Sequence, residues 1–218
     1  MSEIKGTDSQ GSVVFGPEVG QCYGNGWRQL WKYFLELFLI SIVSYVIALP
    51  SALTRVSGVF APFVTVYGIL VGGPVDYGVS FAHLKAARGE KVEVKDMFAA
   101  FGNYWNAVLA SLLVGVIVGI GLVLLIIPGI IFGCKLAFTP YLVVDRKMEV
   151  IEAVKESWRM TGGHALTIFL IGLLAIPISI AGLICLGVGI IPAVMWIRLA
   201  SASLYYSVSA GMEGAQEA

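Results

Sequence analysis

An apolar run of 37 residues, from Val108 to Val144, constrains this chain most, because it contains a single charged residue, Lys135. A helix that crosses the hydrocarbon core of a bilayer needs roughly 20 apolar residues. The run is therefore too long for one crossing and long enough for two. Ile127, Pro128 and Gly129 near its middle predict the turn between them, because proline and glycine end helices. The alternative, one bent helix, would be far longer than the bilayer is thick.

The composition agrees with a membrane protein. Hydrophobic residues make up 58% of the 218 and charged residues 13%, whereas soluble domains carry about 25% charged residues. The 26 glycines also fit, because small residues let membrane helices approach closely. The formal net charge of zero produces no overall field that would favour nucleic acid, and no nucleic-acid partner is expected.

Four further runs qualify as spans or nearly do, and short breaks separate the members of each pair. The breaks lie at 54–57, 127–129 and 187–189, and such short connections force neighbouring helices to run antiparallel. We therefore predict an all-α integral membrane protein of six spans arranged as three helical hairpins. The spans are expected at about 34–53, 58–78, 107–127, 129–144, 165–186 and 190–210.

One membrane domain, residues 21–211, is expected between a polar N-terminal tail, 1–20, and a C-terminal tail, 212–218. The first thirty residues show no apolar signal-peptide core, so the first span is predicted to be retained. Eleven of the fourteen Lys and Arg residues lie before the first span or in the connectors between hairpins and, by the positive-inside rule, face the cytoplasm. Both termini are then cytoplasmic.

An amphipathic segment precedes each predicted hairpin and is expected to lie in the membrane interface. Tyr23, Trp27 and Trp31 recur every four residues before the first hairpin. Asp96 is expected to cap the second segment, and the third, from Val150, carries an apolar stripe that ends at Trp158. Similar spacing in the three units favours a threefold internal repeat of shared orientation. The alternative is the periodicity that any six-span protein with short outer loops shows.

Two stretches resemble a known family. The first is "GGPVDYGVSFAHLKAARGEKVEVKDMFAAF", and the second, more specific one is "IIPGIIFGCKLAFTPYLVVDRKMEVIEAVKESWRMTGGH". Both are similar to motifs of the prokaryotic YciC-like proteins and of the membrane domain linked to some glycerophosphoryl diester phosphodiesterases. The resemblance covers roughly Gly24 to Val208 and implies a six-span prokaryotic membrane protein. It implies no established activity, because the phosphodiesterase domain is absent from this sequence.

Four residues are candidates for contact with a ligand inside the membrane, where charges are costly and often functional. Arg55 lies in the first predicted turn, and Lys135 and Arg198 follow the second and third. Together they could attract an anion or a lipid phosphate, whereas the favoured alternative is that each reaches the outer surface. Asp76 is expected near the cytoplasmic surface, in an ion pair. The matches Gly68-x-x-x-Gly72 and Gly115-x-x-x-Gly119 are expected to pack within the monomer.

The sequence lacks the motifs of common hydrolases and nucleotide-binding enzymes. We therefore expect no catalytic residues, metal site or cofactor, and no enzymatic activity. Two function classes remain open. The favoured one is a membrane-organising scaffold that binds lipid or a partner, and the other is a transporter or channel for a small anion or lipid. The expected partners are the bilayer, a phospholipid or small anion, another membrane protein, or a second copy of the chain.

Overall fold

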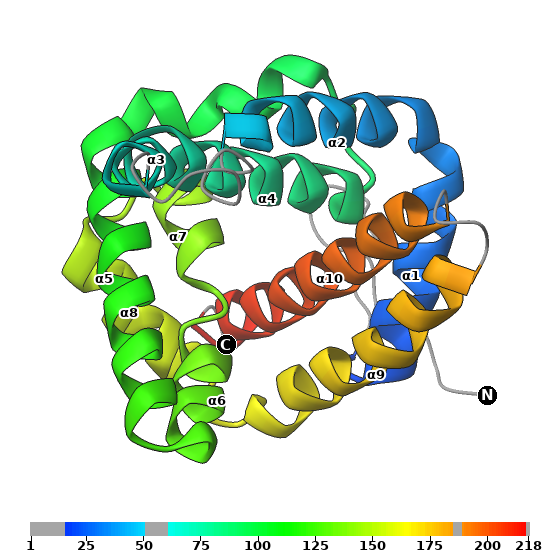
Figure 1. Cartoon of the computed structure of the whole chain (residues 1–218). Helices are drawn as coiled ribbons and strands as arrows, with labels where there is room; N and C mark the ends of the chain where they lie inside the picture. The colour runs from blue at the N-terminus through cyan, green and yellow to red at the C-terminus, as the bar shows by residue number, and fades with distance from the viewer. Residues whose placement is uncertain (1–15, 51–60, 185–188, 217–218) are drawn as a thin grey trace. The chain divides into compact units, whose positions relative to one another are not determined.

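The computed structural model describes residues 16–50, 61–184 and 189–216, and its regular elements there are helices, as predicted (Figure 1). They follow one another as α1 (Val19–Lys32), α2 (Phe34–Ala48), α3 (Ala61–Tyr67), the π-helix η3 (Gly68–Gly72), α4 (Gly73–Arg88), the 3-10 helix η4 (Val94–Asn103), α5 (Tyr104–Leu124), α6 (Ile126–Lys135), α7 (Thr139–Asp145), α8 (Val150–Met160), α9 (Ala165–Ile184) and α10 (Ile190–Gln216).

Three helical stretches among the described residues are long and apolar enough to cross a membrane: Val94–Leu124, Ile126–Asp145 and Ala165–Ile184. A fourth is added if α1 and α2, which meet at 92°, count as one bent span. These stretches are consistent with a membrane-embedded protein.

The chain divides into two compact units. The first comprises residues 1–38, 83–92 and 160–218, and the second comprises 39–82 and 93–159. The first unit thus combines α1 and the end of α4 with α9 and α10. The second contains most of α2 and α4 together with η4, α5, α6, α7 and nearly all of α8.

In the first unit, α1 packs along α10, and α9 lies against α10 as well (Figure 1). The contact with α10 is close because Gly26 has no side chain: a Cβ atom there would lie 3.2 Å from the backbone nitrogen of Ala200. The indole nitrogen of Trp196 donates a hydrogen bond to the carbonyl oxygen of Tyr23 at 2.9 Å. The helix that begins the described chain is therefore fixed to the helix that ends it.

A row of aromatic rings follows the bend between α1 and α2. Successive ring centroids lie 4.9 to 5.8 Å apart, in the order Trp196, Trp27, Trp31, Phe34 and Phe38. Trp27 and Trp31 remain 46% and 62% exposed. Of the predicted aromatic stripe, Trp27 and Trp31 thus lie outward, whereas Tyr23 is buried together with Cys22, Asn25, Gly26 and Leu30.

In the second unit, α5 and α6 run side by side across a break of one residue, Leu125 (Figure 1). The turn was predicted at Ile127 to Gly129, and the structure corrects this: these residues form the first turn of α6. Proline costs little there, because the first helical N–H groups have no partner within the helix. A Cβ atom at Gly121 would lie 2.9 Å from the Cα of Gly129, so glycine permits the close turn.

The span predicted at 129–144 is also not one helix. α6 ends at Lys135, and α7 begins at Thr139 with Pro140 in its first turn. The missing N–H of Pro140 is compatible with a helix start but not with a helix interior. The three residues between the helices, 136–138, interrupt the regular hydrogen bonding of the apolar stretch.

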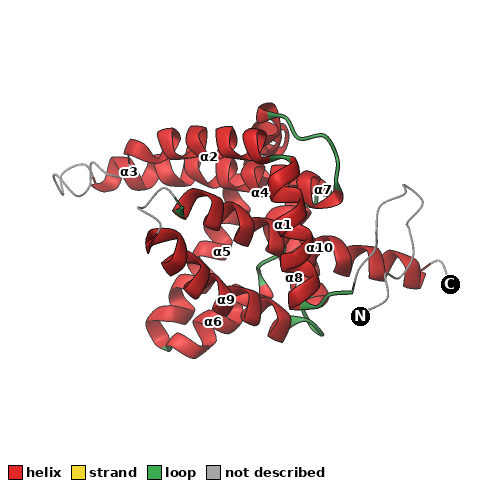
Figure 2. Cartoon of the chain, turned by 90° about the vertical axis from the view of Figure 1, so that its right-hand side faces the viewer, coloured by secondary structure: helices red, strands yellow, loops and turns green. Residues whose placement is uncertain are grey.

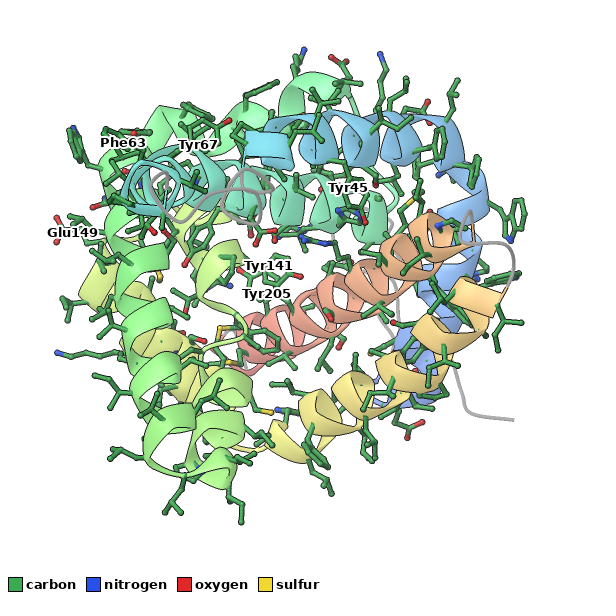
Figure 3. All side chains as sticks on the ribbon, in the orientation of Figure 1. Tyr45, Phe63, Tyr67, Tyr141, Glu149 and Tyr205 are labelled. Atoms are coloured by element: carbon green, nitrogen blue, oxygen red, sulfur yellow. The ribbon has the colours of Figure 1, made fainter. Side chains whose placement is uncertain are left out.

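The remaining part of the second unit pairs α2 with the helix formed by α3, η3 and α4 (Figure 2). The hydroxyl of Tyr67 on α3 donates to the carbonyl oxygen of Ile47 on α2 at 2.9 Å; Tyr67 is labelled in Figure 3. The hydroxyl of Tyr104 on α5 donates to the carbonyl of Leu70 within the π-helix at 3.0 Å. Tyr104 thereby supplies a partner where the helical hydrogen-bond pattern is irregular.

The two glycine pairs predicted to mediate packing do not do so within the described residues. Nothing described lies within 4 Å of a Cβ atom placed at Gly68, Gly72, Gly115 or Gly119. The close approaches occur at other glycines. In the second unit, a Cβ atom at Gly78 on α4 would overlap the backbone carbonyl of Met97 on η4.

The predicted amphipathic segments before the second and third hairpins are helical, with one correction. Asp96 was expected as the cap of the second segment, but Glu93 is the capping residue of η4. The carboxylate of Asp96 accepts a hydrogen bond from the Glu93 backbone N–H at 2.8 Å, which completes a capping box. Trp105, at the start of α5, and Trp158 on α8 are 68% and 44% exposed, so both present aromatic rings outward.

Candidate functional site

Lys135, the one charge in the longest apolar run, lies at the C-terminal end of α6. A cation is favourable there, because the unpaired carbonyl groups give a helix C-terminus partial negative charge. The Nζ of Lys135 also lies over the ring of Trp158 on α8, 5.5 Å from its centroid. That Lys135 reaches the outer surface stays a prediction. The structure places its ammonium beside the amphipathic helix α8, at the end of α6 opposite the turn.

Ser157 on α8 holds the interruption between α6 and α7 and is fully buried. Its hydroxyl donates to the carbonyl oxygen of Lys135 at 2.9 Å and accepts from the N–H of Phe138 at 3.2 Å. An interrupted helix leaves backbone groups without helical partners, and in an apolar environment each must be satisfied. One serine therefore supplies both a donor and an acceptor to the interrupted backbone.

Ser157 was not among the candidates drawn from the sequence. Its signal lay in the second family-like stretch, where Ala153, Ser157 and Trp158 form the Ala-x-x-x-Ser-Trp pattern. Ala153 and Ser157 form the buried side of α8, and Ile151 and Trp158 are exposed. The amphipathic pattern of α8 gave no signal that a serine lies on its buried side.

The other three candidate ligand-contact residues, Arg198, Arg55 and Asp76, are not shown beside Lys135. Arg198 lies on α10 in the first unit and is partly exposed, whereas Lys135 belongs to the second unit. Arg55 lies outside the described residues. Asp76 is exposed in the first turn of α4, where its backbone carbonyl accepts the Ser80 hydroxyl at 2.9 Å. The grouping of the three cations thus stays a hypothesis.

A polar cluster that the sequence did not reveal lies in the first unit, around Asn25 on α1. Asn25 is 5% exposed. Its amide nitrogen donates to the carbonyl oxygen of Ala87 at 3.0 Å and to the hydroxyl of Ser203 on α10 at 2.9 Å. Its amide oxygen accepts a hydrogen bond from the guanidinium of Arg28 at 3.3 Å. One amide thus joins α1, α10 and the end of α4.

Cys22, one turn before Asn25, is fully buried on α1. Burial raises the pKa of its thiol from an ordinary value of 9.0 to about 12. The neutral thiol acts here as a small apolar side chain. Among the described residues, no group of three or more His, Cys, Asp or Glu side chains is placed to hold a metal ion.

No known family model, no curated protein and no solved structure matches this chain.

Proposed function

We propose that this chain is a multi-pass protein of a prokaryotic cytoplasmic membrane that organises lipids or partner proteins at the cytoplasmic face, without catalysis of its own. In this proposal it crosses the bilayer six times as three hairpins, with both termini in the cytoplasm. It belongs with the YciC-like proteins, which its two family-like stretches resemble. The eleven basic residues before the first span and between the hairpins support this orientation.

The observation that carries the proposal is the outward position of a tryptophan on or directly after each amphipathic helix. Trp31 on α1, Trp105 directly after η4, and Trp158 on α8 are 62%, 68% and 44% exposed. Tryptophan favours the level of the lipid headgroups, because its ring is apolar and its N–H is polar. Three such anchors, each shortly before the start of a predicted span, fit a protein that binds lipids or partner proteins at the membrane interface.

An internal repeat is supported by how two of the amphipathic helices, α1 and α8, dock. Gly26 and Trp27 of α1 meet α10 at Leu199 and Trp196, while Ser157 and Trp158 of α8 meet α6 at Lys135 and Phe132. In each case a small buried residue and the tryptophan after it contact two positions on a helix. Positions 135 and 199 are 64 residues apart, and so are 132 and 196. The docking is therefore equivalent in the two units.

The same interval relates other residues. The triplet Ile-Ile-Pro occurs at 126–128 and again at 190–192. Tyr77, Tyr141 and Tyr205 follow one another at intervals of 64 residues, and all three are buried; Tyr141 and Tyr205 are labelled in Figure 3. In our proposal each tyrosine marks the same position in the second helix of one hairpin.

Transport of a small anion or a lipid is the second candidate, and one observation favours it. Lys135 lies where the stretch Ile126–Asp145 is interrupted. Interrupted helices in membrane transporters commonly form binding sites, because the interruption frees backbone groups and helix ends for a ligand. In this alternative, Lys135, Arg198 and Arg55 line the path of the anion, and Asp76 lies at its cytoplasmic side.

Proteoliposomes distinguish the two candidates. The purified full chain is reconstituted in vesicles of mixed phospholipids, and the efflux of chloride and of phosphate and the exchange of labelled phospholipid are measured. The scaffold proposal predicts rates equal to those of empty vesicles, together with phospholipids that co-purify in similar amounts with wild type and with Lys135→Ala and Arg198→Ala. Flux that either substitution abolishes would replace the scaffold by the transporter.

A further inference from the structure

Basic and aromatic side chains come together in the first unit, where α1 crosses the C-terminal end of α4. We define this basic–aromatic surface by six residues from the two helices: Trp27, Arg28, Trp31 and Lys32 of α1, and Lys85 and Arg88 of α4. Of these residues, Trp27 also takes part in the docking of α1 on α10, through its ring contact with Trp196.

Three hydrogen bonds hold the two helices in this crossing. The Asn25 amide donates to the Ala87 carbonyl, and the Tyr33 hydroxyl donates to the Gly89 carbonyl at 2.5 Å. The ammonium of Lys32 donates to the same Gly89 oxygen at 3.3 Å. Gly89 adopts a φ of 80°, a left-handed conformation that ends α4 and turns its carbonyl toward α1. The Lys32 ammonium of α1 is therefore held at the C-terminal end of α4, the helix that carries Lys85 and Arg88.

Positive charge predominates on this surface. Arg28 and Lys32 are exposed, and Lys85 and Arg88 are partly exposed. Lys91, which follows α4, is exposed as well, and Glu90 lies 3.9 Å from Arg88. Residues 27–36 and 85–91 contain five basic residues and two acidic ones, Glu36 and Glu90. Five basic residues against two acidic ones attract anions, and they do so most strongly in the low dielectric of a membrane interface.

The aromatic part of the surface distinguishes a lipid from a free anion. Trp27 and Trp31 stack edge to face at 5.6 Å and lie next to Arg28 and Lys32 along α1. Phe34 continues the ring row at the 92° bend into α2, where the predicted first span begins. A headgroup phosphate has glycerol and acyl chains attached, and exposed indole rings offer an apolar surface to them. A free anion would gain nothing from these rings.

We propose that the basic–aromatic surface binds the headgroup phosphate of an anionic phospholipid of the cytoplasmic leaflet. Arg28, Lys32 and Arg88 contact the phosphate, and Trp27 and Trp31 lie along the glycerol and the upper acyl chain. This inference rests on the proposed function and deepens it, because it names the lipid class and the surface. It places the contact on α1 and α4 and does not involve Lys135.

The test is lipid selection by the full-length protein in nanodiscs that contain equal amounts of phosphatidylglycerol and phosphatidylcholine. Native mass spectrometry counts the lipids that remain bound after the disc is removed. Wild type should retain phosphatidylglycerol preferentially. Neutralising one interfacial cation weakens the attraction about fivefold, so Arg28→Gln with Lys32→Gln should lower the preference at least about tenfold. Trp31→Ala should weaken retention of both lipids, because it removes apolar contact rather than charge.

Lys155→Gln is the matched control, because Lys155 is an exposed lysine on the equivalent amphipathic helix α8 and lies outside the surface. It should leave the preference unchanged, and unfolding midpoints confirm that each variant is folded. An equal loss in Lys155→Gln, or no loss in the double variant, would overturn the assignment, as would displacement of the lipid by millimolar inorganic phosphate. Absence of any preference in wild type would also overturn it and leave an acidic protein partner as the occupant.

Failure of the headgroup site and failure of the proposed function give different experimental results. A preference for phosphatidylglycerol that no surface variant changes removes this site and leaves lipid organisation intact. Flux in proteoliposomes that requires Lys135 removes the scaffold and leaves the headgroup site intact.

Discussion

At the scale of single residues, the glycines divide into two groups that the sequence does not separate. Gly68 and Gly72, which form a recognised packing motif, have open space beside them within the described structure. Gly78, in no such motif, lies against the backbone of Met97. Spacing shows which glycines share a helix face, but only the neighbouring helix decides which face is in contact. This information is not local in sequence.

Replacing Gly78 with alanine is therefore expected to destabilise the protein. The added methyl group would overlap the Met97 carbonyl, which belongs to the backbone and cannot rotate away. Overpacking of this kind costs about 1–3 kcal/mol, and denaturant unfolding in detergent micelles would measure the loss. Gly72→Ala, six residues earlier on the same continuous helix, is the control and should leave the unfolding free energy unchanged or slightly higher. Equal effects of the two substitutions would contradict the packing described for η4 on α4.

The thiol of Cys22 reports on the docking of α1. Because burial raises its pKa from 9.0 to about 12, its thiolate fraction at pH 8 is about a thousandfold below that of an ordinary thiol. In a variant with Cys134 and Cys185 replaced by alanine, we expect very slow reaction with a maleimide. The rate should rise as the pH increases toward the folded-state pKa, because the reactive thiolate is the deprotonated form.

Gly26→Leu should accelerate this reaction, because a large side chain facing Ala200 separates α1 from α10. Gly24→Leu is the matched control, since nothing lies within 4 Å of a Cβ atom there. Fast labelling of Cys22 in the protein with Gly26 intact would show that α1 is not docked as described.

At the scale of elements, the interruption between α6 and α7 depends on a residue of a third helix. Ser157→Ala leaves the Lys135 carbonyl and the Phe138 N–H without the serine hydroxyl, and we expect a loss of about 1–3 kcal/mol in unfolding free energy. Ser201→Ala is the control, because that hydroxyl bonds within its own helix, to Ile197 at 3.2 Å. The control should change stability by less than about 0.5 kcal/mol. A neutral Ser157→Ala would mean that the interruption is held by other contacts.

The existence of the elements could be predicted from the sequence better than their ends. Apolar runs and amphipathic stripes located the helices, because both are local properties of the chain. The turn was placed at Pro128 although the break is at Leu125, because proline is tolerated at a helix start as well as in a turn. The interruption after Lys135 was missed, because it is stabilised by Ser157, which lies 22 residues further along the chain.

For the candidate site as well, single residues could be found from the sequence but their contacts could not. Lys135 was found because a charge in an apolar run is conspicuous, but its neighbour Trp158 and its place beside α8 depend on tertiary packing. Asn25 was missed, because an asparagine in a polar segment carries no signal until its partners on α4 and α10 are known. Buried polar residues of this kind organise the contacts of the chain and are the least visible in a single sequence.

At the scale of the whole molecule, the proposed function depends on the orientation of the chain in the membrane. We propose that the basic connectors lie in the cytoplasm and that the turns lie outside. This orientation follows from the distribution of charge rather than from helix packing. The equal intervals of 64 residues are compatible with this orientation. Each proposed repeat crosses the membrane twice, so the next repeat begins on the same side. The test must therefore report the side of the membrane directly.

Single cysteines in a variant without native cysteines provide that measurement. Lys91→Cys marks a connector and Pro128→Cys marks the turn region between α5 and α6. In intact cells, a membrane-impermeant thiol reagent should label the cysteine at position 128 and should reach the one at position 91 only after the membrane is permeabilised. Labelling of both positions from the same face of intact cells would contradict the proposed hairpins and the orientation built on them.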